Sequence, residues 1–379
     1  MRTNRLRRRC RDRRCAVEVR TRARTVRKRL NDALQRLAHA CGYHVSRLPA
    51  PVTGFEPARS PEPRVCHYEQ LFVRHNGDLF PCCDTWGRPD LRIGHLDDPD
   101  LIEKIRRFRL HCALCGAYTL RAAEQDEPVR VVGINVETSL TCQGQCAMCS
   151  VEAPAWRGKY EYYDAIVRLV AQLQPTQLWV QGGEVLVQGQ TLAMLDDIKR
   201  RWPDIKIGLV TNGNADTAMA DTVERLFSSV TVSIVGFQPG TYRSIMGLSF
   251  DRTAAFVDEI SRRRSTEITL KFLLTPSNLH ELPLFLEWAI GKQPAKVLVD
   301  DAGMGDYVNR GAPYQYWSKI VARTLSETQA VLLRHSSHLA ATGVRVYFTA
   351  PARRTLAWSG DWTRFAADER LKGVVARWS

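Results

Sequence analysis

The chain has 379 residues, of which 44% are hydrophobic and 25% are charged, as in an ordinary globular protein. This length is enough for one large domain and a smaller one. No run of about 18 apolar residues is present, which excludes an obvious membrane span, and no apolar signal core is recognisable, so we expect a cytoplasmic protein.

The net charge of +14 is concentrated at one end of the chain. Residues 1–30 contain 14 Lys and Arg against two acidic residues, a net of +12, which leaves only +2 for the rest. This composition predicts a disordered basic tail because self-repelling charge cannot bury a core. Such a tail could bind nucleic acid by releasing counterions. It lacks interleaved aromatic residues, so a solvated tail or an upstream extension is the preferred interpretation.

The 11 cysteines are also unevenly distributed, because none follows residue 149. In a reducing compartment, clustered thiols indicate metal ligands rather than disulfides. Residues 1–64 read as the basic tail, a short helix over 26–40 and a proline-rich linker over 49–63. Cys10, Cys15 and Cys41 lie there, and we assign them no metal.

A compact cysteine-bearing segment is expected over residues 65–120. Two short apolar runs joined at Asn76-Gly77 predict a β-hairpin with a two-residue turn. Residues 99–110 predict a short helix that leads to Cys112.

From residue 129 onward, strands and helices alternate. Strands are expected at 129–137, 176–181, 205–211, 229–235, 267–274 and 295–300, with helices near 160–173, 188–202, 215–228, 251–264 and 279–291. Six βα units predict an α/β fold with a parallel sheet, covered on both faces. A partial (βα)6 barrel over 121–310 is preferred to an open doubly wound sheet. Residues 311–379 read as a mostly helical extension with one strand.

Three cysteines directly follow the first of these strands. Cys142, Cys146 and Cys149 are spaced by four and three residues in the segment TCQGQCAMC. Three thiolates from one loop can ligate three irons of a four-iron cluster, leaving the fourth iron open. A zinc site would normally need a fourth ligand, and no other Cys or His is close in sequence.

This pattern resembles the radical S-adenosylmethionine superfamily. The second strand ends in Gln181-Gly182-Gly183-Glu184, similar to the family's GGE motif, and the third ends in Thr211-Asn212-Gly213, similar to its TNG. The fourth ends in Ser233-Ile234-Val235-Gly236, followed by TYRSIMG, like the family's serine-containing stretch. The resemblance covers residues 129–300. Taken singly, the glycine motifs could be ordinary turns, but the active-site groups of a βα barrel gather at these strand ends.

The resemblance implies a role for each matching residue. The three cysteines would hold a 4Fe-4S cluster, and the cofactor would be S-adenosylmethionine. Contacts to this cofactor would come from Met148, Gly182, Gly183, Glu184, Thr211, Asn212 and Ser233. Met148 replaces the usual aromatic residue, and Val235 replaces a frequent aspartate. The implied reaction is reductive cleavage of S-adenosylmethionine to a 5′-deoxyadenosyl radical, which abstracts hydrogen from a substrate.

The upstream cysteines resemble a twitch domain, the half-size relative of the SPASM domain, here placed before the barrel. The implied ligands of a second, auxiliary 4Fe-4S cluster are Cys66, Cys82, Cys112 and Cys115. Spacing alone does not separate this cluster from structural zinc. Cys83 could replace Cys82, but neighbouring side chains on a strand face opposite ways, so only one should point inward.

Three functions are compatible with these observations. The first is radical modification of a peptide or protein, with an electron donor such as flavodoxin or ferredoxin. The second is the same chemistry on a small molecule such as a sugar or an envelope precursor. The third is a zinc-stabilised nucleic-acid-binding protein, which leaves the cysteine triad unexplained. Asp300 and Asp301 at the sixth strand end and Lys271 in the fifth strand are candidate catalytic residues, although acidic strand ends also cap helices.

Overall fold

The computed structural model describes residues 65–66, 70–83, 85, 89–108, 110–111, 131–149, 151, 153–301, 314–357, 365, 368–371 and 375–377. All of them belong to one compact unit, Glu56–Ser379. The predicted basic tail, first helix and linker lie outside the described residues, as do Cys112, Cys115 and the side chain of Cys66.

Eleven of the described strands form a single sheet in the order β13-β12-β11-β10-β9-β8-β7-β6-β2-β3-β4. All neighbouring pairs from β13 to β2 are parallel, and only β3 and β4 at one edge are antiparallel. The strands are β2 (Gln70–Val73), β3 (Asp78–Phe80), β4 (Gly94–His95), β6 (Gly133–Glu137), β7 (Gln177–Gln181), β8 (Lys206–Thr211), β9 (Ser229–Ile234), β10 (Glu267–Leu274), β11 (Lys296–Asp301), β12 (Arg345–Phe348) and β13 (Val375–Arg377).

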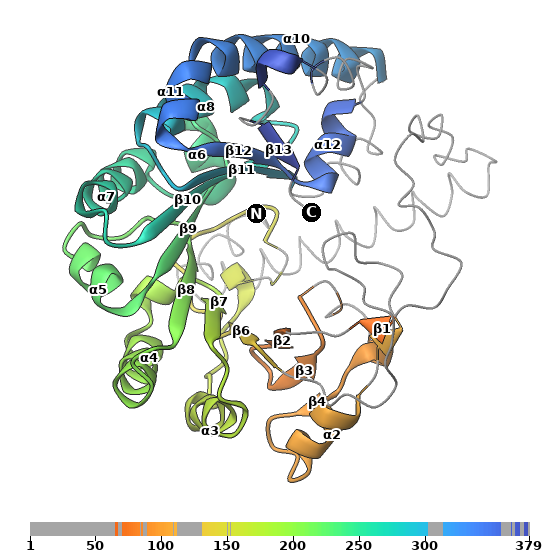
Figure 1. Cartoon of the computed structure of the whole chain (residues 1–379), viewed down its shortest axis with the longest axis vertical. Helices are drawn as coiled ribbons and strands as arrows, with labels where there is room; N and C mark the ends of the chain where they lie inside the picture. Colours follow the sequence, from red (N-terminus) through yellow and green to blue (C-terminus); the bar gives the residue numbers. More distant parts are fainter. Residues whose placement is uncertain are drawn as a thin grey trace, which may run out of the picture. The chain divides into compact units, whose positions relative to one another are not determined.

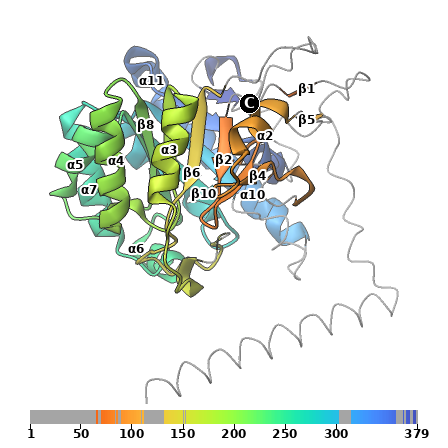
Figure 2. The ribbon, with the colours of Figure 1, turned by 90° about the horizontal axis from the view of Figure 1, so that it is seen from below.

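Helices connect the parallel strands and pack on one face of the sheet (Figure 1). Figure 2 shows α3, α4, α5 and α7 together on that side. The helices are α2 (Leu101–Arg107), α3 (Tyr163–Leu173), α4 (Gly189–Arg201), α5 (Met219–Leu226), α6 (Pro239–Met246), α7 (Phe250–Arg263), α8 (Leu282–Gly291), α10 (Tyr314–Arg334), α11 (Ser336–Thr342) and α12 (Ala350–Leu356). The α/β architecture with a parallel sheet is therefore confirmed. The chain also forms α6, which overlaps the TYRSIMG stretch, and the late strand β13, neither of which was predicted.

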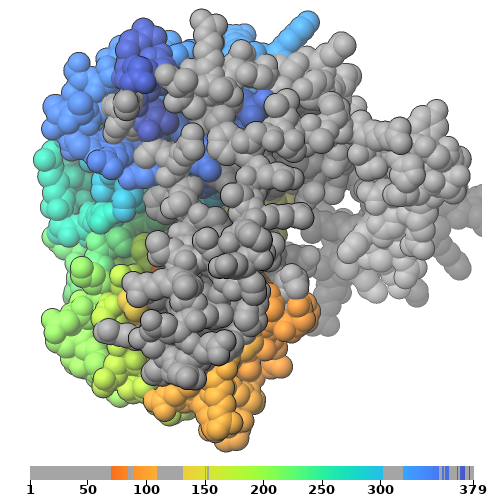
Figure 3. All heavy atoms as spheres, turned by 45° about the vertical axis from the view of Figure 1, so that its right-hand side comes forward, coloured from red at the N-terminus to blue at the C-terminus, as the bar shows by residue number. Residues whose placement is uncertain are grey.

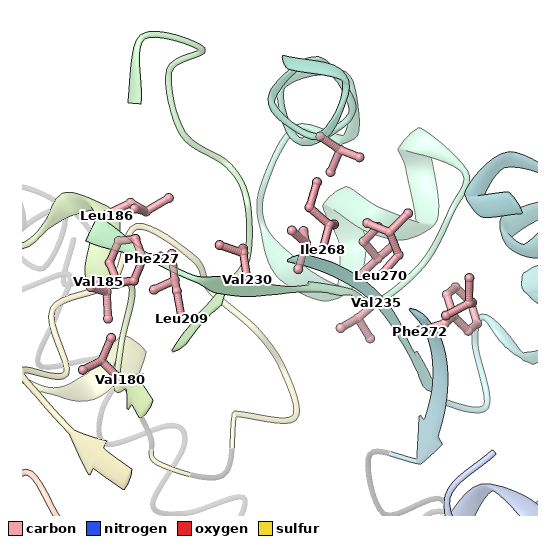
Figure 4. Close-up of a cluster of buried hydrophobic side chains, with 14 of the residues drawn as sticks. Val180, Val185, Leu186, Leu209, Phe227, Val230, Val235, Ile268, Leu270 and Phe272 are labelled. Atoms are coloured by element: carbon pink, nitrogen blue, oxygen red, sulfur yellow. The ribbon is translucent and has the colours of Figure 1, made fainter. Parts of the chain in front are cut away.

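Burial alternates along β7, β9, β10 and β12, so these strands present a more apolar side and a more polar side. In β10, Ile268, Leu270 and Phe272 are buried under the helices, whereas Thr269 and Lys271 between them are only partly buried. Figure 4 shows part of this apolar layer, in which each fully buried side chain stabilises the fold by about 1.5–3 kcal/mol. The second face carries the polar side chains of the site.

The predicted hairpin is present, but its turn is longer than two residues. Arg74 donates its backbone N–H to Asp78, and Gly77 donates to Arg74, which makes a loop of three residues closed by Gly77 with a φ of 86°. Because β2 also pairs in parallel with β6, the hairpin extends the large sheet instead of standing apart from it. The described residues between 70 and 107 (orange) lie beside the first βα units (yellow to green) in Figure 3.

The C-terminal segment completes the opposite edge of the sheet. β12 and β13 add in parallel to β11, and α10 packs against α8. No helix in the described part of the chain combines the length and the apolar character needed to cross a bilayer.

Candidate metal centre at the carboxyl edge of the sheet

The three cysteines lie in the loop that follows β6, at the carboxyl edge of the parallel strands. All three are partly buried and none forms a disulfide. Gly144 lies at the centre of the loop, where a Cβ atom would be 3.4 Å from Cys142 Sγ and 3.6 Å from Cys146 Sγ. Two of the sulfur atoms therefore face the same small space beside Gly144.

Burial and neighbouring charges disfavour ionisation of two of these thiols, Cys142 and Cys146. Burial raises the pKa of Cys142, and the nearby charges of Glu184 and Cys149 raise it further. Burial, together with Cys142 and Cys149, raises the pKa of Cys146 to about 12. Thiolates at this site therefore need a cationic partner, which is the condition under which metal binding displaces thiol protons.

Gly182 and Gly183 allow the end of β7 to pack against the backbone of the cysteine loop. A Cβ at Gly183 would lie 2.2 Å from the Thr141 carbonyl oxygen. Gly182 has a φ of 150°, and a Cβ there would lie 2.7 Å from the Ser139 carbonyl oxygen. Gly183 donates its N–H to Ser139 (2.9 Å), and the next residue in the chain donates to Thr141 (2.9 Å). The glycine pair is thus required by contact between the two loops.

Glu184 ties the end of β7 to the end of β8. Its side chain is only 1% exposed. The carboxylate accepts hydrogen bonds from the Thr211 hydroxyl (2.7 Å) and from the backbone N–H groups of Asn212 (2.7 Å) and Leu186 (3.1 Å). Burial raises the pKa of Glu184, and these hydrogen bonds oppose the rise. The motif glutamate is therefore fixed in place before any ligand binds.

Asn212 joins β8 to the cysteine loop. Its carboxamide oxygen accepts hydrogen bonds from the Asn214 N–H (2.8 Å) and from Gln143 Nε2 (3.4 Å), and its Nδ2 lies 3.9 Å from Cys142 Sγ. The TNG segment therefore contacts the cysteine loop through side chains.

Gln188 is a buried residue of the site that the sequence analysis missed. Its amide nitrogen donates to the carbonyl groups of Ser139 (2.7 Å) and Thr141 (3.1 Å), and its oxygen accepts from the hydroxyls of Thr138 and Thr191. It therefore clamps the start of the cysteine loop. The one sequence feature that could have pointed to Gln188 as a site residue is its position four residues after Glu184.

The far side of the cysteine loop pairs with the end of α6. Gln145 and Ala147 donate their N–H groups to the carbonyls of Met246 (2.7 Å) and Ile245 (3.0 Å). Gly247 has a φ of 69°, and a Cβ there would lie 2.8 Å from the side chain of Gln145. The TYRSIMG stretch therefore supports the loop. Met148 is partly buried against the core.

Ser233, Lys271 and Asp300 lie on the polar face of neighbouring strands. Ser233 is the register partner of Lys271, and Lys271 Nζ is 3.2 Å from Asp300 Oδ2. Asp300 also accepts a hydrogen bond from the Thr349 hydroxyl (2.7 Å). Asp301 accepts from Thr355. Lys271 and Asp300 thus form an ion pair, while both aspartates are held by hydroxyls from the C-terminal segment.

A second buried carboxylate at this edge, Glu137, was not predicted. Its Oε2 accepts hydrogen bonds from His75 Nδ1 (2.6 Å) and the His75 N–H (3.1 Å), and it pairs with Arg74 Nε (3.3 Å). Burial opposes the ionisation of Glu137, but these contacts outweigh it and lower its pKa. The Tyr160 side chain is only 4% exposed. Burial raises the pKa of Tyr160, and the nearby charge of Glu137 raises it further. The three-residue hairpin loop brings Arg74 and His75 to the end of β6.

The upstream cysteines are described only in part. β1 (Val65–Cys66) pairs antiparallel with β5 (Leu110–His111), so the backbone of Cys66 lies opposite Leu110. Cys82 is partly buried, whereas Cys83 is exposed. Both follow the end of β3 in a turn, so the expected alternation along a strand does not apply to them.

Among the described residues, no three His, Cys, Asp or Glu side chains gather closely enough to hold a single metal ion. The sequence matches no family model and no curated protein.

Several solved structures resemble part of the chain. Streptococcus suis SuiB bound to S-adenosylmethionine has a TM-score of 0.42 and 11% identity, with coverage of 57% of this chain and 49% of SuiB. SuiB bound to the precursor peptide SuiA has a TM-score of 0.43 and 9% identity, with coverage of 65% and 57%. The anSMEcpe structure with bound AdoMet and a Cp18Cys peptide has a TM-score of 0.44 and 15% identity, with coverage of 56% and 62%. The match thus spans about half of SuiB in its first structure.

Proposed function

We propose that this chain is a radical S-adenosylmethionine enzyme, with Cys142, Cys146 and Cys149 as ligands of a 4Fe-4S cluster. The observation that carries the proposal is the convergence of three strand ends on one cysteine loop. The loop is hydrogen-bonded to the Gly183-Glu184 turn after β7, to Asn212 after β8 and to the end of α6 after β9. Ligands bind at the carboxyl edge of a parallel sheet. A cysteine loop with only a structural role would not need to be hydrogen-bonded to three strand ends at this edge.

The chemistry of the donor set fits such a cluster. A 4Fe-4S cluster takes one thiolate for each iron, so its ligands need not converge on one ion. The raised pKa values of Cys142 and Cys146 mean that bound irons would supply the positive charge that the thiolates lack. Three thiolates leave one iron available to S-adenosylmethionine.

When bound, the cluster and cofactor supply reductive cleavage of the sulfonium to methionine and a 5′-deoxyadenosyl radical. The side chains of the protein would hold the cofactor in position. A cofactor ammonium needs acceptors, and Glu184 uses three hydrogen bonds of the roughly four that a carboxylate accepts. An ammonium there would favour the charged form of Glu184 against the burial that raises its pKa. Met148, Gly182, Thr211 and Ser233 are proposed as further cofactor contacts.

We propose a peptide or protein as substrate, bound along the polar face of the sheet. Support comes from the Lys271–Asp300 ion pair, whose side chains are each 22% exposed. These two residues and Asp301 are the proposed substrate-contacting groups. Small polar molecules could use the same face, so product analysis with both classes is required. A cytoplasmic flavodoxin or ferredoxin is the proposed electron donor.

An auxiliary cluster is proposed at Cys66, Cys82, Cys112 and Cys115. Support comes from the pairing of β1 with β5, because β5 ends one residue before Cys112. The hairpin strand β3 ends two residues before Cys82. Zinc at these four cysteines remains the alternative, and metal analysis distinguishes the two.

The test is anaerobic purification followed by cluster reconstitution. Two clusters correspond to about eight irons per chain. Addition of S-adenosylmethionine and a strong reductant should then produce 5′-deoxyadenosine, and Cys142→Ala should abolish it. Wild-type protein that carries a reduced cluster but leaves the cofactor intact would refute the enzymatic assignment.

A further inference from the structure

Asn212 occupies a position at which its side chain has little freedom. Its backbone N–H donates to the buried Glu184 carboxylate, which fixes the residue directly after β8. Its carboxamide oxygen accepts from the Asn214 N–H at 2.8 Å and from Gln143 Nε2 at 3.4 Å. Because both of these partners are N–H donors, the oxygen must face them and the amide NH₂ must face the other way.

On that other side lies the sulfur of Cys142. The distance from Asn212 Nδ2 to Cys142 Sγ is 3.9 Å, and the Gly144 N–H approaches the same sulfur at 3.3 Å. In the part of the chain that the structure describes, no side-chain donor is recorded at the sulfur of Cys146 or Cys149. Among the three thiols, Cys142 is therefore distinguished by hydrogen bonds from the N–H groups of two other residues, whereas the hydrogen bond that acts on Cys146 comes from its own backbone N–H.

We propose that Asn212 is a positioning residue that donates a hydrogen bond to the Cys142 thiolate and thereby raises the reduction potential of the cluster. This inference rests on the proposed function, since it concerns the cluster proposed there. One electron entering the cluster adds negative charge, which a nearby N–H dipole stabilises, and hydrogen bonds to ligand sulfurs are known to set such potentials. Asn212 thus makes the cluster easier to reduce, which is the step that precedes cofactor cleavage.

The test compares wild-type protein with Asn212→Leu, which removes the donor and keeps the approximate size. Reconstituted samples are titrated with titanium(III) citrate, and the reduced cluster is followed by electron paramagnetic resonance. To remove the proposed auxiliary cluster, every sample in this titration also carries Cys82→Ala, so the reference is the protein with wild-type Asn212 and Cys82→Ala. The expected result is a more negative midpoint potential in Asn212→Leu. An unchanged potential in a variant that retains its cluster would overturn the inference.

Asn135→Leu is a matched control, because it removes a carboxamide from β6 that has no recorded sulfur contact in the described residues. Its midpoint potential should equal that of wild type. If both variants shift equally, the effect is not specific to the Cys142 contact and the inference fails.

A second measurement avoids mutation of Asn212 altogether. Wild-type protein labelled with ¹⁵N at asparagine carboxamides should show a ¹⁵N coupling to the reduced cluster in pulsed paramagnetic resonance, and the absence of coupling would also overturn the inference. Wild-type protein that assembles no 4Fe-4S signal at all would instead refute the proposed function.

Discussion

Gly183 offers the sharpest test of how the cysteine loop is held, because its contacts are with backbone atoms that cannot rotate away. A Cβ at this position would lie 2.2 Å from the Thr141 carbonyl oxygen and 2.5 Å from the carbonyl carbon and oxygen of Leu140. Real Cβ atoms essentially never come within 3.0 Å of a heavy atom outside their own residue and its two chain neighbours. In Gly183→Ala the loop must therefore shift by roughly 1 Å, as overpacked groups do elsewhere in folded proteins.

The cost of that shift has two parts. Overpacking of this kind destabilises a protein by about 1–3 kcal/mol. The hydrogen bonds from Gly183 to Ser139 and from Glu184 to Thr141, both 2.9 Å, run between the same two segments and would lengthen. Each such bond is worth about 1 kcal/mol. We expect Gly183→Ala to lower the free energy of unfolding by about 2–4 kcal/mol, which is more than a tenfold change in the unfolding equilibrium.

The matched control is Gly189→Ala at the start of α4. No atom lies within 4 Å of the Cβ that this substitution adds, so the variant should be as stable as wild type or more stable by about 0.4–1 kcal/mol. Both variants are unfolded with urea in the cluster-free form, and iron is counted after reconstitution. Gly183→Ala should lose stability and bind less iron. If it matches Gly189→Ala in both measurements, the contact between the glycine turn and the cysteine loop does not hold the site together.

Three further outcomes are expected. Cys142→Ala should lower the iron content by about four atoms per chain, whereas Cys10→Ala should leave it unchanged, and equal iron in both proteins would contradict the proposed ligand. In the cluster-free protein, Cys146 has a pKa raised to about 12, so at pH 8 it should react with iodoacetamide far more slowly than the exposed Cys83, as read by mass spectrometry of the peptides. Folding lowers the pKa of Glu137, so its ionisation stabilises the native state above pH 4.5, the ordinary pKa of a glutamate, and this stability is lost as the pH falls through the lower pKa of the folded state. Glu137→Gln should therefore be less stable at pH 7 and should flatten the acid limb of the unfolding free energy, whereas an acid limb identical to that of wild type would contradict the lowered pKa.

The strands and helices of the βα units could be predicted from sequence because their apolar periodicity is strong. β10 (Glu267–Leu274) coincides with the predicted strand, and α7 (Phe250–Arg263) differs by one residue at each end. The site motifs could also be predicted from sequence, because glycine pairs and cysteine spacing are local features. The packing contacts that these motifs make could not be predicted from sequence. Gln188, for example, contacts Thr138, which lies 50 positions earlier in the chain, and no local pattern encodes such a contact.

The predicted length of the hairpin turn was wrong by one residue, and this small difference changes which side chains reach the end of β6. A two-residue turn at Asn76-Gly77 would place Arg74 and His75 within paired strands, where their backbone groups face a ladder partner. The three-residue loop instead releases His75 to donate two hydrogen bonds to Glu137. Sequence reasoning therefore missed this buried charge cluster because its existence depends on turn geometry and on the parallel pairing of β2 with β6.

That pairing also bears on how the two cysteine-bearing segments could cooperate. β2 runs parallel to β6, so the carboxyl ends of both strands lie at one edge of the same sheet. The cysteine loop follows β6 directly, and the Glu137 contacts with Arg74 and His75 fix the hairpin to the last residue before that loop. A rigid sheet with a buried ion pair resists relative sliding of the two strands, because moving either one leaves the 3%-exposed carboxylate of Glu137 without its partners. If Cys82 contributes to an auxiliary cluster, its distance from the triad is set by this connection. Glu137→Gln should then increase amide hydrogen exchange in β2 and β6 together, and a rise confined to one strand would show that the hairpin and the cysteine loop move independently.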